Sequence, residues 1–435
     1  MLIEFSVANF RSIKERITLS MVAGSLKNEL SENVISRPEL TFNLLKSAVI
    51  YGANASGKSN LILALKFMRY MILSSAKESQ SSELIPDETF KLSEETENVP
   101  SAFEIVFVCD GVRYRYGFEV TPKNVVKEYL FHVPKKIETV LFSRSNQVYE
   151  LKGIYKKEAK DIVAKTRENT LLLSAVAQWN GEISRKITDW FMASLNCISG
   201  NREKSYPGFT IDKCENDNTK KQILDLLKIA DLGIDGFEVE EKEVPFEDLP
   251  EGLRRFITSN TDKKPPIEIN IYTNHTKYNT KLEPASIVKF DLDEIESEGT
   301  KKLFALAGPI LDTLSNGKTL IVDEMDSKLH PLLTQTIIKL FHSTIINPKN
   351  AQLIFATHDT NILTHDFFRR DQIWFTEKNK YGATDLYSLQ DYKISNGSKI
   401  RKDATYAKDY ILGKYGAIPF IGDFYSVFKK SKSNW

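Results

Sequence analysis

The sequence predicts an α/β fold with a mixed β-sheet lobe, a β-hairpin subdomain and an inserted helical region. The first supporting observation is an apolar run at 47–51 that meets Gly52 and is followed by apolar positions at helical spacing, a strand–loop–helix succession. The second is a pair of β-rich runs within 102–120 that flank Asp110–Gly111, a dipeptide typical of tight hairpin turns. The third is an alternation of strands and helices after residue 300, which implies a parallel sheet.

The remaining elements follow from hydrophobic periodicity and turn residues. We expect further short strands within 125–150 and a mainly helical stretch at 155–235, followed by an acidic, proline-containing linker at 240–265. The expected elements after it are strands at 267–273 and 286–291, a helix at 300–314, a strand at 319–323, a helix at 331–346, a strand at 352–357 and a helix around 360–370. No long heptad run is visible, so a coiled-coil arm is not expected.

The chain has 435 residues, more than one compact core usually holds, so several regions are expected. The five regions that we assign are an N-terminal part of the core with the glycine loop (1–72), a loop and antiparallel β subdomain (73–150), a mainly helical insert or lid (151–265), a C-terminal part of the core (266–395) and a tail (396–435).

The composition is that of an ordinary globular protein, with 41% hydrophobic and 27% charged residues and a net charge of +1. The N-terminus lacks the pattern of a secretory signal, and no apolar run approaches the ~20 residues of a membrane span, so we expect a cytoplasmic protein with no membrane association. The three cysteines are scattered without metal-site spacing. The charge balance gives no support for nucleic-acid binding, although a neutral protein with clustered basic residues could still bind it.

Residues 52–59, GANASGKS, match the phosphate-loop pattern GxxxxGK[ST]. Gly52 and Gly57 let the backbone wrap closely around phosphate oxygens, and the following helix N-terminus presents positive potential. Lys58 is expected to reach the β- and γ-phosphates, and the Ser59 hydroxyl to ligate Mg²⁺. The motif lies between a predicted strand and a predicted helix, which is the context that it requires.

Two later strands end in candidate catalytic groups. Residues 319–324, TLIVDE, end in Asp323, which would hold Mg²⁺ mostly through water, and Glu324, which could act as general base on the attacking water. The strand FATHD ends at His358, which can hydrogen-bond a γ-phosphate. In isolation these residues also fit a strand that exits to solvent and a surface or capping histidine, but their order after the phosphate loop favours the catalytic interpretation.

A second anion-binding device is possible at residues 297–300, SEGT, which precede an apolar helical run. A plain helix N-cap by Ser or Thr explains the same letters, and by itself this simpler interpretation is favoured.

These four elements, in this order, resemble the ATPase heads of the ABC superfamily, in the branch with RecF, SMC-type and OLD proteins. More narrowly, the chain resembles the AAA15 family of ATPases, which includes the RloA and AbiLi proteins. The resemblance covers nearly the whole chain and is least distinctive at 175–265. The stretches that carry it are NFRSIKE, YGANASGKSNLILAL, the FEIVF and YRYGFEV hairpin, SEGTKKLFAL, LIVDEMDSKLHPLL, FATHDTNIL and AKDYILGKYGAIPFIGDF. The resemblance implies an ABC-type P-loop NTPase head in which two protomers sandwich two ATP molecules.

The resemblance also implies roles for individual residues. Ser297 and Gly299 would reach the γ-phosphate of ATP held by the partner protomer, and Asp326 would lie in the loop that crosses the dimer interface. His358 would be the switch histidine. The chain reads SEGT where the common ABC signature reads LSGGQ, which leaves open what Glu298 contributes in trans. The residues expected to bind ATP and its Mg²⁺ around the phosphate loop are Gly52, Asn54, Ser56, Gly57, Lys58, Ser59, Asn60 and Asp323, with Lys58 and Glu324 also catalytic.

The glutamine that would complete the metal site is not securely placed by the motifs. Gln178 in LLLSAVAQWN is the candidate, and a glutamine on a helix surface is the alternative.

Three functions remain open from the sequence. The first is an ATPase that dimerises around ATP and gates a separately encoded effector, a nuclease or an RloB-like protein, in bacterial anti-phage defence. The second is a RecF- or SMC-like ATPase of DNA repair or chromosome maintenance that binds nucleic acid directly. The third is a slowly hydrolysing, ATP-dependent assembly scaffold. ATP is expected from the resemblance, since no motif that reads the base distinguishes ATP from GTP.

Overall fold

The computed structural model describes residues 1–26, 29–77, 83–86, 88–198, 206–230, 233–245, 247, 249, 267–393, 400 and 404–419. Its contacts divide the chain into two units. The first unit joins Met1–Gly200 with Thr313–Ser327 and Thr334–Trp435. The second unit joins Asn201–Asp312 with Lys328–Leu333.

A seven-stranded antiparallel sheet fills one part of the first unit, in the order β10-β9-β8-β7-β6-β1-β2. Its strands are β1 (Leu2–Ala8), β2 (Ile17–Ser20), β6 (Ser101–Cys109), β7 (Val112–Val120), β8 (Val125–Val133), β9 (Thr139–Ser145) and β10 (Val148–Leu151). Asp110 and Gly111 turn β6 into β7 with φ values of 49° and 75°, the left-handed pair that a two-residue hairpin loop needs. The predicted hairpin and the strands after it are therefore confirmed.

A second, six-stranded sheet of the same unit has the order β11-β15-β16-β5-β17-β18. The strands are β5 (Ser47–Gly52), β11 (Leu195–Ile198), β15 (Thr319–Val322), β16 (Gln352–Ala356), β17 (Ile373–Lys378) and β18 (Thr384–Ser388). All neighbours pair in parallel except β17 with β18. Strands β5, β15 and β16 are buried throughout, as expected of central strands in a parallel sheet. The predicted mixed α/β fold with a parallel sheet is confirmed.

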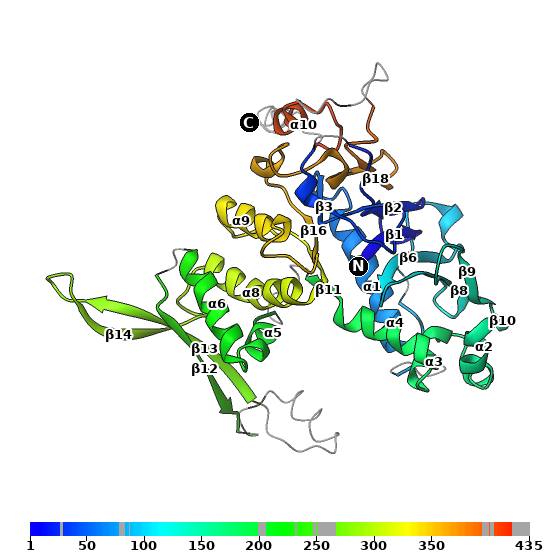
Figure 1. Ribbon diagram of the computed structural model, residues 1–435, viewed down its shortest axis with the longest axis horizontal. Coiled ribbons are helices and arrows are strands. Elements are labelled where there is room, and N and C mark those ends of the chain that lie inside the picture. The colour runs from blue at the N-terminus through cyan, green and yellow to red at the C-terminus, as the bar shows by residue number, and fades with distance from the viewer. Residues whose placement is uncertain are drawn as a thin grey trace, which may run out of the picture. The chain divides into compact units, whose positions relative to one another are not determined.

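The helices of the first unit are α1 (Lys58–Ser74), α2 (Gly153–Ala159), α3 (Leu172–Gln178), α4 (Glu182–Ala193), α9 (Pro331–His342, with its first turn in the second unit) and α10 (Tyr406–Ile411). Short pieces complete the unit: β3 (Val34–Ile35), β4 (Leu44–Leu45) and the 3₁₀ turns η1 (Ser31–Asn33), η2 (Glu94–Thr96) and η3 (Val163–Lys165). Helix α1 buries Leu61, Ile62, Leu65, Met68 and Ile72 in a large apolar core shared with the antiparallel sheet. Figure 1 shows α1, in blue, between strands of both sheets.

The helix predicted around 360–370 is absent, and that prediction was wrong. The chain there forms only the 3₁₀ turns η6 (Thr360–Ile362) and η7 (Arg370–Gln372). The side chains of Asp359 and Thr364 accept hydrogen bonds from the backbone N–H groups of residues 361 and 366, at 2.9 and 3.3 Å. Such local bonds compete with helical backbone pairing and favour turns.

The second unit contains a three-stranded antiparallel sheet, β12-β13-β14, with helices α5, α6 and most of α8 (Figure 1). The bounds are α5 Tyr206–Lys213, α6 Asp217–Ile229, β12 Gly236–Glu243, β13 Ile267–Tyr278, β14 Pro284–Asp291 and α8 Glu298–Asn316. The rings of Phe237 on β12 and Phe304 on α8 pack with their centroids 5.4 Å apart.

Two expectations for the middle of the chain need correction. The region 151–265, expected to be mainly helical, also contributes strands β11 and β12. The linker expected at 240–265 overlaps β12, because the acidic residues of this strand pair with β13 instead of lying in a loop. The rest of that stretch, from 251 onward, lies outside the described residues, as does most of the tail at 396–435.

None of the helices in the described part of the chain combines the length and the apolar character that a bilayer crossing needs.

Candidate nucleotide-binding site

Three parallel strands of the six-stranded sheet end at the same edge. Ile50 on β5 lies opposite Ala356 on β16, and Phe355 on β16 lies opposite Val322 on β15. The residues that follow these strands are the phosphate loop, the Asp323–Glu324 pair and the turn with His358. Sheet register therefore brings together three motifs that lie far apart in the sequence, at the edge where α/β proteins bind ligands.

The two glycines of the loop are required by close packing. A Cβ atom on Gly57, the N-cap of α1 with a φ of 115°, would lie 2.3 Å from Oγ1 of Thr384. A Cβ atom on Gly52 would lie 2.4 Å from Oγ1 and 2.5 Å from the carbonyl oxygen of Thr376. The loop between them turns tightly, since the N–H of Ser56 donates to the carbonyl of Ala53 over 3.1 Å. Only glycine fits at either end of this loop.

Lys58, the first residue of α1, folds back over the loop. Its ammonium donates to the carbonyls of Gly52 and Ala53 at 2.7 and 3.1 Å, and the side chain is 6% exposed. Burial lowers the pKa of Lys58 to about 8. The carboxylates of the 323–326 segment act in the opposite direction on this pKa, which places them within electrostatic reach of the ammonium.

Asp323 and Asp326 each present one carboxylate oxygen to the site. In the described part of the molecule, Oδ1 of each is buried without a hydrogen-bond partner. Oδ2 of Asp326 accepts a hydrogen bond from the N–H of His358 at 3.2 Å. A buried, unpaired carboxylate oxygen is costly, so it indicates a ligand such as a metal ion or its bound water.

Glu324 follows Asp323 with a φ of 51°, in the left-handed region that non-glycine residues rarely adopt. Its side chain is exposed. The chain turns out of β15 at this strained residue. As a result, the neighbouring carboxylates differ in exposure: Asp323 is buried and Glu324 is exposed.

His358 completes the cluster. Burial and the nearby Lys58 lower its pKa, while Asp326, Glu324 and Asp323 act to raise it. The net lowering keeps the imidazole mostly neutral near pH 7, where one ring nitrogen can donate and the other accept. The carbonyl of the next residue, Asp359, accepts a 3.0 Å hydrogen bond from the buried hydroxyl of Tyr51, the residue before Gly52.

The other predicted loop residues occupy different environments. Asn54 is exposed at the loop, Ser59 is half-buried in the first turn of α1, and Ser56 is buried. Asn60 donates to the hydroxyl of Ser12 at 2.7 Å. No side chain caps the N-terminus of α1, whose N-cap residue is Gly57. Because the first N–H groups of a helix have no partner within the helix, this turn can bind an anion.

Ser297, Glu298 and Gly299 belong to the second unit. The Ser297 hydroxyl accepts from the N–H of Thr300 at 3.1 Å, as an N-cap of α8 does. Glu298 pairs with Lys301 and Lys328 at 3.0 and 2.9 Å, and these two hydrogen-bonded ammonium groups lower its pKa to about 2. A Cβ on Gly299 would lie 2.9 Å from the carbonyl of Lys328. The structure thus gives these residues a capping geometry within the second unit.

Gln178 does not reach the metal site, and its assignment there needs correction. It ends α3 and lines a cavity with Ile72 and Leu73 at the C-terminal end of α1 and with Ala76 and Lys77 just after that helix. Helix α1 has 17 residues and is therefore about 25 Å long, with the phosphate loop at its other end. Gln178 is an exposed residue at a helix end, the alternative that the sequence left open.

The structure adds three residues to which the sequence assigned no role: Ser12, which lies in the stretch NFRSIKE, Thr376 and Thr384. Thr376 and Thr384, on the β17–β18 hairpin, bond to Ser56 of the phosphate loop, and Ser12 bonds to Thr384 and to Asn60. Single hydroxyl residues in loops and strands are too common to be recognised from sequence, and no local pattern distinguishes these.

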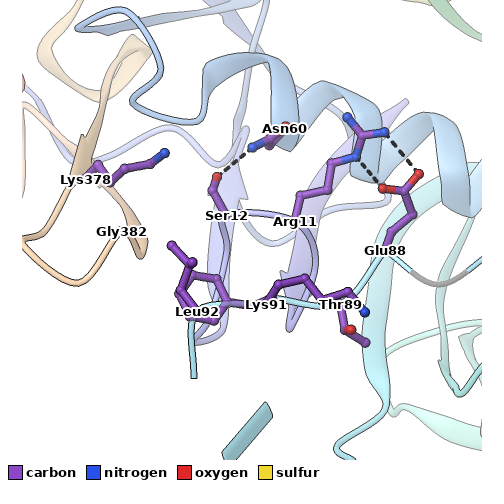
Figure 2. Close-up of a pocket in the computed structure, with 10 residues that line it drawn as sticks. Arg11, Ser12, Asn60, Glu88, Thr89, Lys91, Leu92, Lys378 and Gly382 are labelled. Carbon is purple, nitrogen blue, oxygen red and sulfur yellow. Dashed lines mark hydrogen bonds and ion pairs between the residues drawn. The ribbon is translucent and has the colours of Figure 1, made fainter. Parts of the chain in front are cut away.

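A cavity of about 460 Å³ lies beside the loop, next to Asn60. Its lining residues are Arg11, Ser12, Asn60, Glu88, Thr89, Phe90, Lys91, Leu92, Lys378 and Gly382. Figure 2 shows the Asn60–Ser12 hydrogen bond and the Arg11–Glu88 ion pair on neighbouring walls of this cavity. Its volume lies in the range of small-molecule pockets.

A parallel sheet edge, a glycine loop leading into a helix, a buried lysine and unpaired carboxylates define a P-loop nucleotide-binding protein. The family model described as "AAA domain, putative AbiEii toxin, Type IV TA system" matches residues 47–364, and the chain belongs to that family.

Among solved structures, the chain is similar to an SMC head bound to the C-winged helix domain of ScpA, with 14% identity over 89% of this chain and 97% of that chain and a TM-score of 0.41. It is similar to the SMC head domain from Thermotoga maritima, with 13% identity, coverage of 89% and 98% and a TM-score of 0.40. It is also similar to the recombination mediator protein RecF in complex with ATPrS, with 14% identity, coverage of 89% and 98% and a TM-score of 0.38. No curated protein matches the chain.

Proposed function

We propose that this protein binds ATP with Mg²⁺ and hydrolyses it. One observation carries the proposal: the register of β5, β16 and β15 brings the phosphate loop with Lys58 and the segment 323–326 to the same edge of the sheet, although more than 260 residues separate them in sequence. The unpaired Oδ1 atoms of Asp323 and Asp326 fit the donor set that a hard divalent cation prefers.

The chain's own groups divide the chemistry among them. The backbone of the loop and the first turn of α1 bind the phosphates, and Lys58 exchanges its two carbonyl contacts for phosphate oxygens. Ser59 and Asp323 would hold Mg²⁺, which supplies charge neutralisation at the β- and γ-phosphates. Glu324 takes a proton from the attacking water, and neutral His358 donates a hydrogen bond to the γ-phosphate.

The cavity next to Asn60 is the place that we assign to the nucleoside. It adjoins the helix turn that receives the phosphates, and it offers both an apolar wall at Phe90 and Leu92 and polar side chains at Arg11 and Lys378. A pocket of this kind positions a planar base and orients it by a few polar contacts.

In the cycle that we propose, two protomers close around two ATP molecules, and Ser297 and Gly299 of each protomer face the γ-phosphate bound by the other. Hydrolysis opens the dimer and changes the state of a separately encoded effector, a nuclease or an RloB-like protein, in bacterial defence against phage. The description of the matching family, which names a toxin of a toxin–antitoxin system, supports a defence role. The narrower AAA15 resemblance supports the separate effector and a cytoplasmic location.

The proposal is tested with Glu324→Gln and Lys58→Ala. Glu324→Gln should lower kcat for ATP by about 10²- to 10⁴-fold, the usual contribution of a general base, and retain ATP binding in calorimetry. Lys58→Ala should lose ATP binding itself. Turnover in Glu324→Gln equal to that of the wild type would remove Glu324 from its role, and a wild-type protein that takes up no Mg-ATP would refute the proposal as a whole.

A further inference from the structure

A series of hydrogen bonds that the nucleotide motifs do not include ends at a backbone carbonyl of the phosphate loop. Nδ2 of Asn60 donates to Oγ of Ser12 at 2.7 Å. Oγ of Ser12 and Oγ1 of Thr384 are 2.8 Å apart, and Oγ1 of Thr384 donates to the carbonyl oxygen of Ser56 at 2.8 Å. Thr384 is 4% exposed, so the series is shielded from water where it meets the loop.

The donor and the acceptor of every hydrogen bond in this series are determined. A hydroxyl has one proton to donate, and Thr384 gives its proton to the Ser56 carbonyl, which has none. Ser12 must therefore donate to Thr384, and its lone pairs remain free to accept from Asn60. The run Asn60 to Ser12 to Thr384 to Ser56 is a single directed series, in which each member polarises the next.

The last acceptor in the series sets the orientation of a peptide group in the loop. In a planar trans peptide the C=O and N–H bonds point to opposite sides. Because Thr384 anchors the carbonyl of Ser56, the N–H of Gly57 points away from Thr384. The backbone N–H groups of such loops bind phosphate oxygens. Because the peptide plane is fixed, the N–H of Gly57 is oriented before a phosphate binds.

A second contact holds the other end of the loop in the same manner. Oγ1 of Thr376 donates to the carbonyl of Tyr51 at 3.3 Å, so the 2.6 Å contact between Thr376 and Ser56 takes its proton from the Ser56 hydroxyl. Thr376 and Thr384 come from the adjacent strands β17 and β18. They are also the side chains that exclude a Cβ atom at Gly52 and Gly57.

We propose that Thr384 is a positioning residue for nucleotide binding: through Ser56 it presets the phosphate loop in its binding conformation, with Ser12 and Asn60 orienting the Thr384 hydroxyl. This inference rests on the proposed function, because it concerns the same ATP site. The β17–β18 hairpin thereby acts as a brace, contributed by a part of the chain more than 300 residues after the loop.

The test compares Thr384→Val, which keeps the shape and removes the hydroxyl, with Thr384→Ser, which keeps the hydroxyl. Loss of about one hydrogen bond's free energy should raise the dissociation constant and KM for Mg-ATP about tenfold in Thr384→Val and leave kcat at saturation within about twofold. Thr384→Ser should bind Mg-ATP within about twofold of the wild type.

Thr18→Val is the matched control. Thr18 on β2 shares a 2.8 Å hydroxyl–hydroxyl hydrogen bond with Ser6 on the adjacent strand of the other sheet, so Thr18→Val removes a hydroxyl hydrogen bond that does not touch the phosphate loop. Thr18→Val should lower the unfolding midpoint and leave the affinity for Mg-ATP unchanged. A selective loss of affinity in Thr384→Val, restored in Thr384→Ser, is the expected result.

Two outcomes overturn the inference. One is a folded Thr384→Val that binds Mg-ATP as tightly as the wild type, and the other is a Thr384→Ser as weak as Thr384→Val. If Thr384→Val does not fold, Ser12→Ala is the deciding variant, because it leaves the Thr384–Ser56 hydrogen bond in place but removes the donor that orients the Thr384 hydroxyl. The affinity for Mg-ATP should then be about two- to fivefold weaker, of the order of one weakened hydrogen bond. An unchanged affinity refutes the inference. Absence of Mg-ATP binding by the wild type would instead refute the proposed function.

Discussion

Lys58 shows how a single residue can be prepared for a triphosphate. Its ammonium is buried and donates hydrogen bonds to two loop carbonyls. Three nearby carboxylates favour its protonated form. Burial is the larger effect, so the pKa of Lys58 falls to about 8. A bound triphosphate adds negative charge beside the ammonium and favours its protonated form. Binding of ATP is therefore coupled to the charge of this one side chain.

This coupling predicts the pH dependence of ATP affinity. A lysine whose pKa is lowered loses its proton in the free protein as the pH rises through about 8, and binding must then return that proton. Between about pH 7 and about pH 9 the association constant of Mg-ATP should fall about tenfold, as calorimetry in two buffers of different ionisation enthalpy can show together with proton uptake. Lys58→Arg, which stays charged throughout, is the control, and an equal fall in that variant would contradict the assignment.

At the scale of elements, a buried ion pair joins β8, β9 and α3. The carboxylate of Glu128 accepts hydrogen bonds from the N–H groups of Leu172 and Leu173 at 2.7 and 3.0 Å, and so caps the start of α3. Arg144 on β9 lies 3.5 Å away, and both side chains are fully buried. Arg144 also donates to the carbonyl of Thr170. The pair thus attaches the helical segment after residue 166 to the antiparallel sheet and lies apart from the nucleotide site.

Glu128→Ala should therefore lower stability and not catalysis. Removal of Glu128 leaves the buried guanidinium without its counter-charge, although backbone carbonyls still accept from it, and leaves two helix N–H groups unpaired. This should cost about 3–5 kcal/mol in the free energy of unfolding. Glu119→Ala, which breaks the more exposed Glu119–Lys127 pair on the neighbouring strands, should cost no more than about 1 kcal/mol. Denaturant titrations of both variants check this, and equal losses would show that burial does not set the energy of the pair.

At the scale of the whole molecule, the two halves of the proposed active site lie in different units of the chain. The phosphate loop and its carboxylates belong to the first unit, and the α8 N-terminus with Ser297 belongs to the second. In the proposed ATP sandwich, each site uses the loop of one protomer and the α8 N-terminus of the other. A variant defective in only one half should then be complemented by a variant defective in the other half.

This complementation is directly measurable. Lys58→Ala removes the loop function, and Ser297→Arg blocks the α8 N-terminus with an exposed side chain. Each variant alone should lack ATPase activity. When the two variants are mixed in equal amounts, about half of the dimers are heterodimers, and each heterodimer has one intact site of its two. About a quarter of the wild-type activity should therefore return. Activity in the mixture no greater than the sum of the separate variants would contradict a shared site, and chelation of Mg²⁺ by EDTA should abolish the recovered activity.

The sequence by itself determined what depends on neighbouring residues: the GxxxxGK[ST] loop, the Asp110–Gly111 hairpin, and the buried strands that end just before Asp323 and before His358. These follow from local backbone chemistry and from the alternation of apolar residues, which a short window contains. Only the tertiary structure decided that Gln178 lies at the far end of α1 and that Thr384 braces the loop. Ser12 and Thr384 are 372 residues apart, and contacts of that kind arise from the packing of segments that are distant in sequence, which no local pattern encodes.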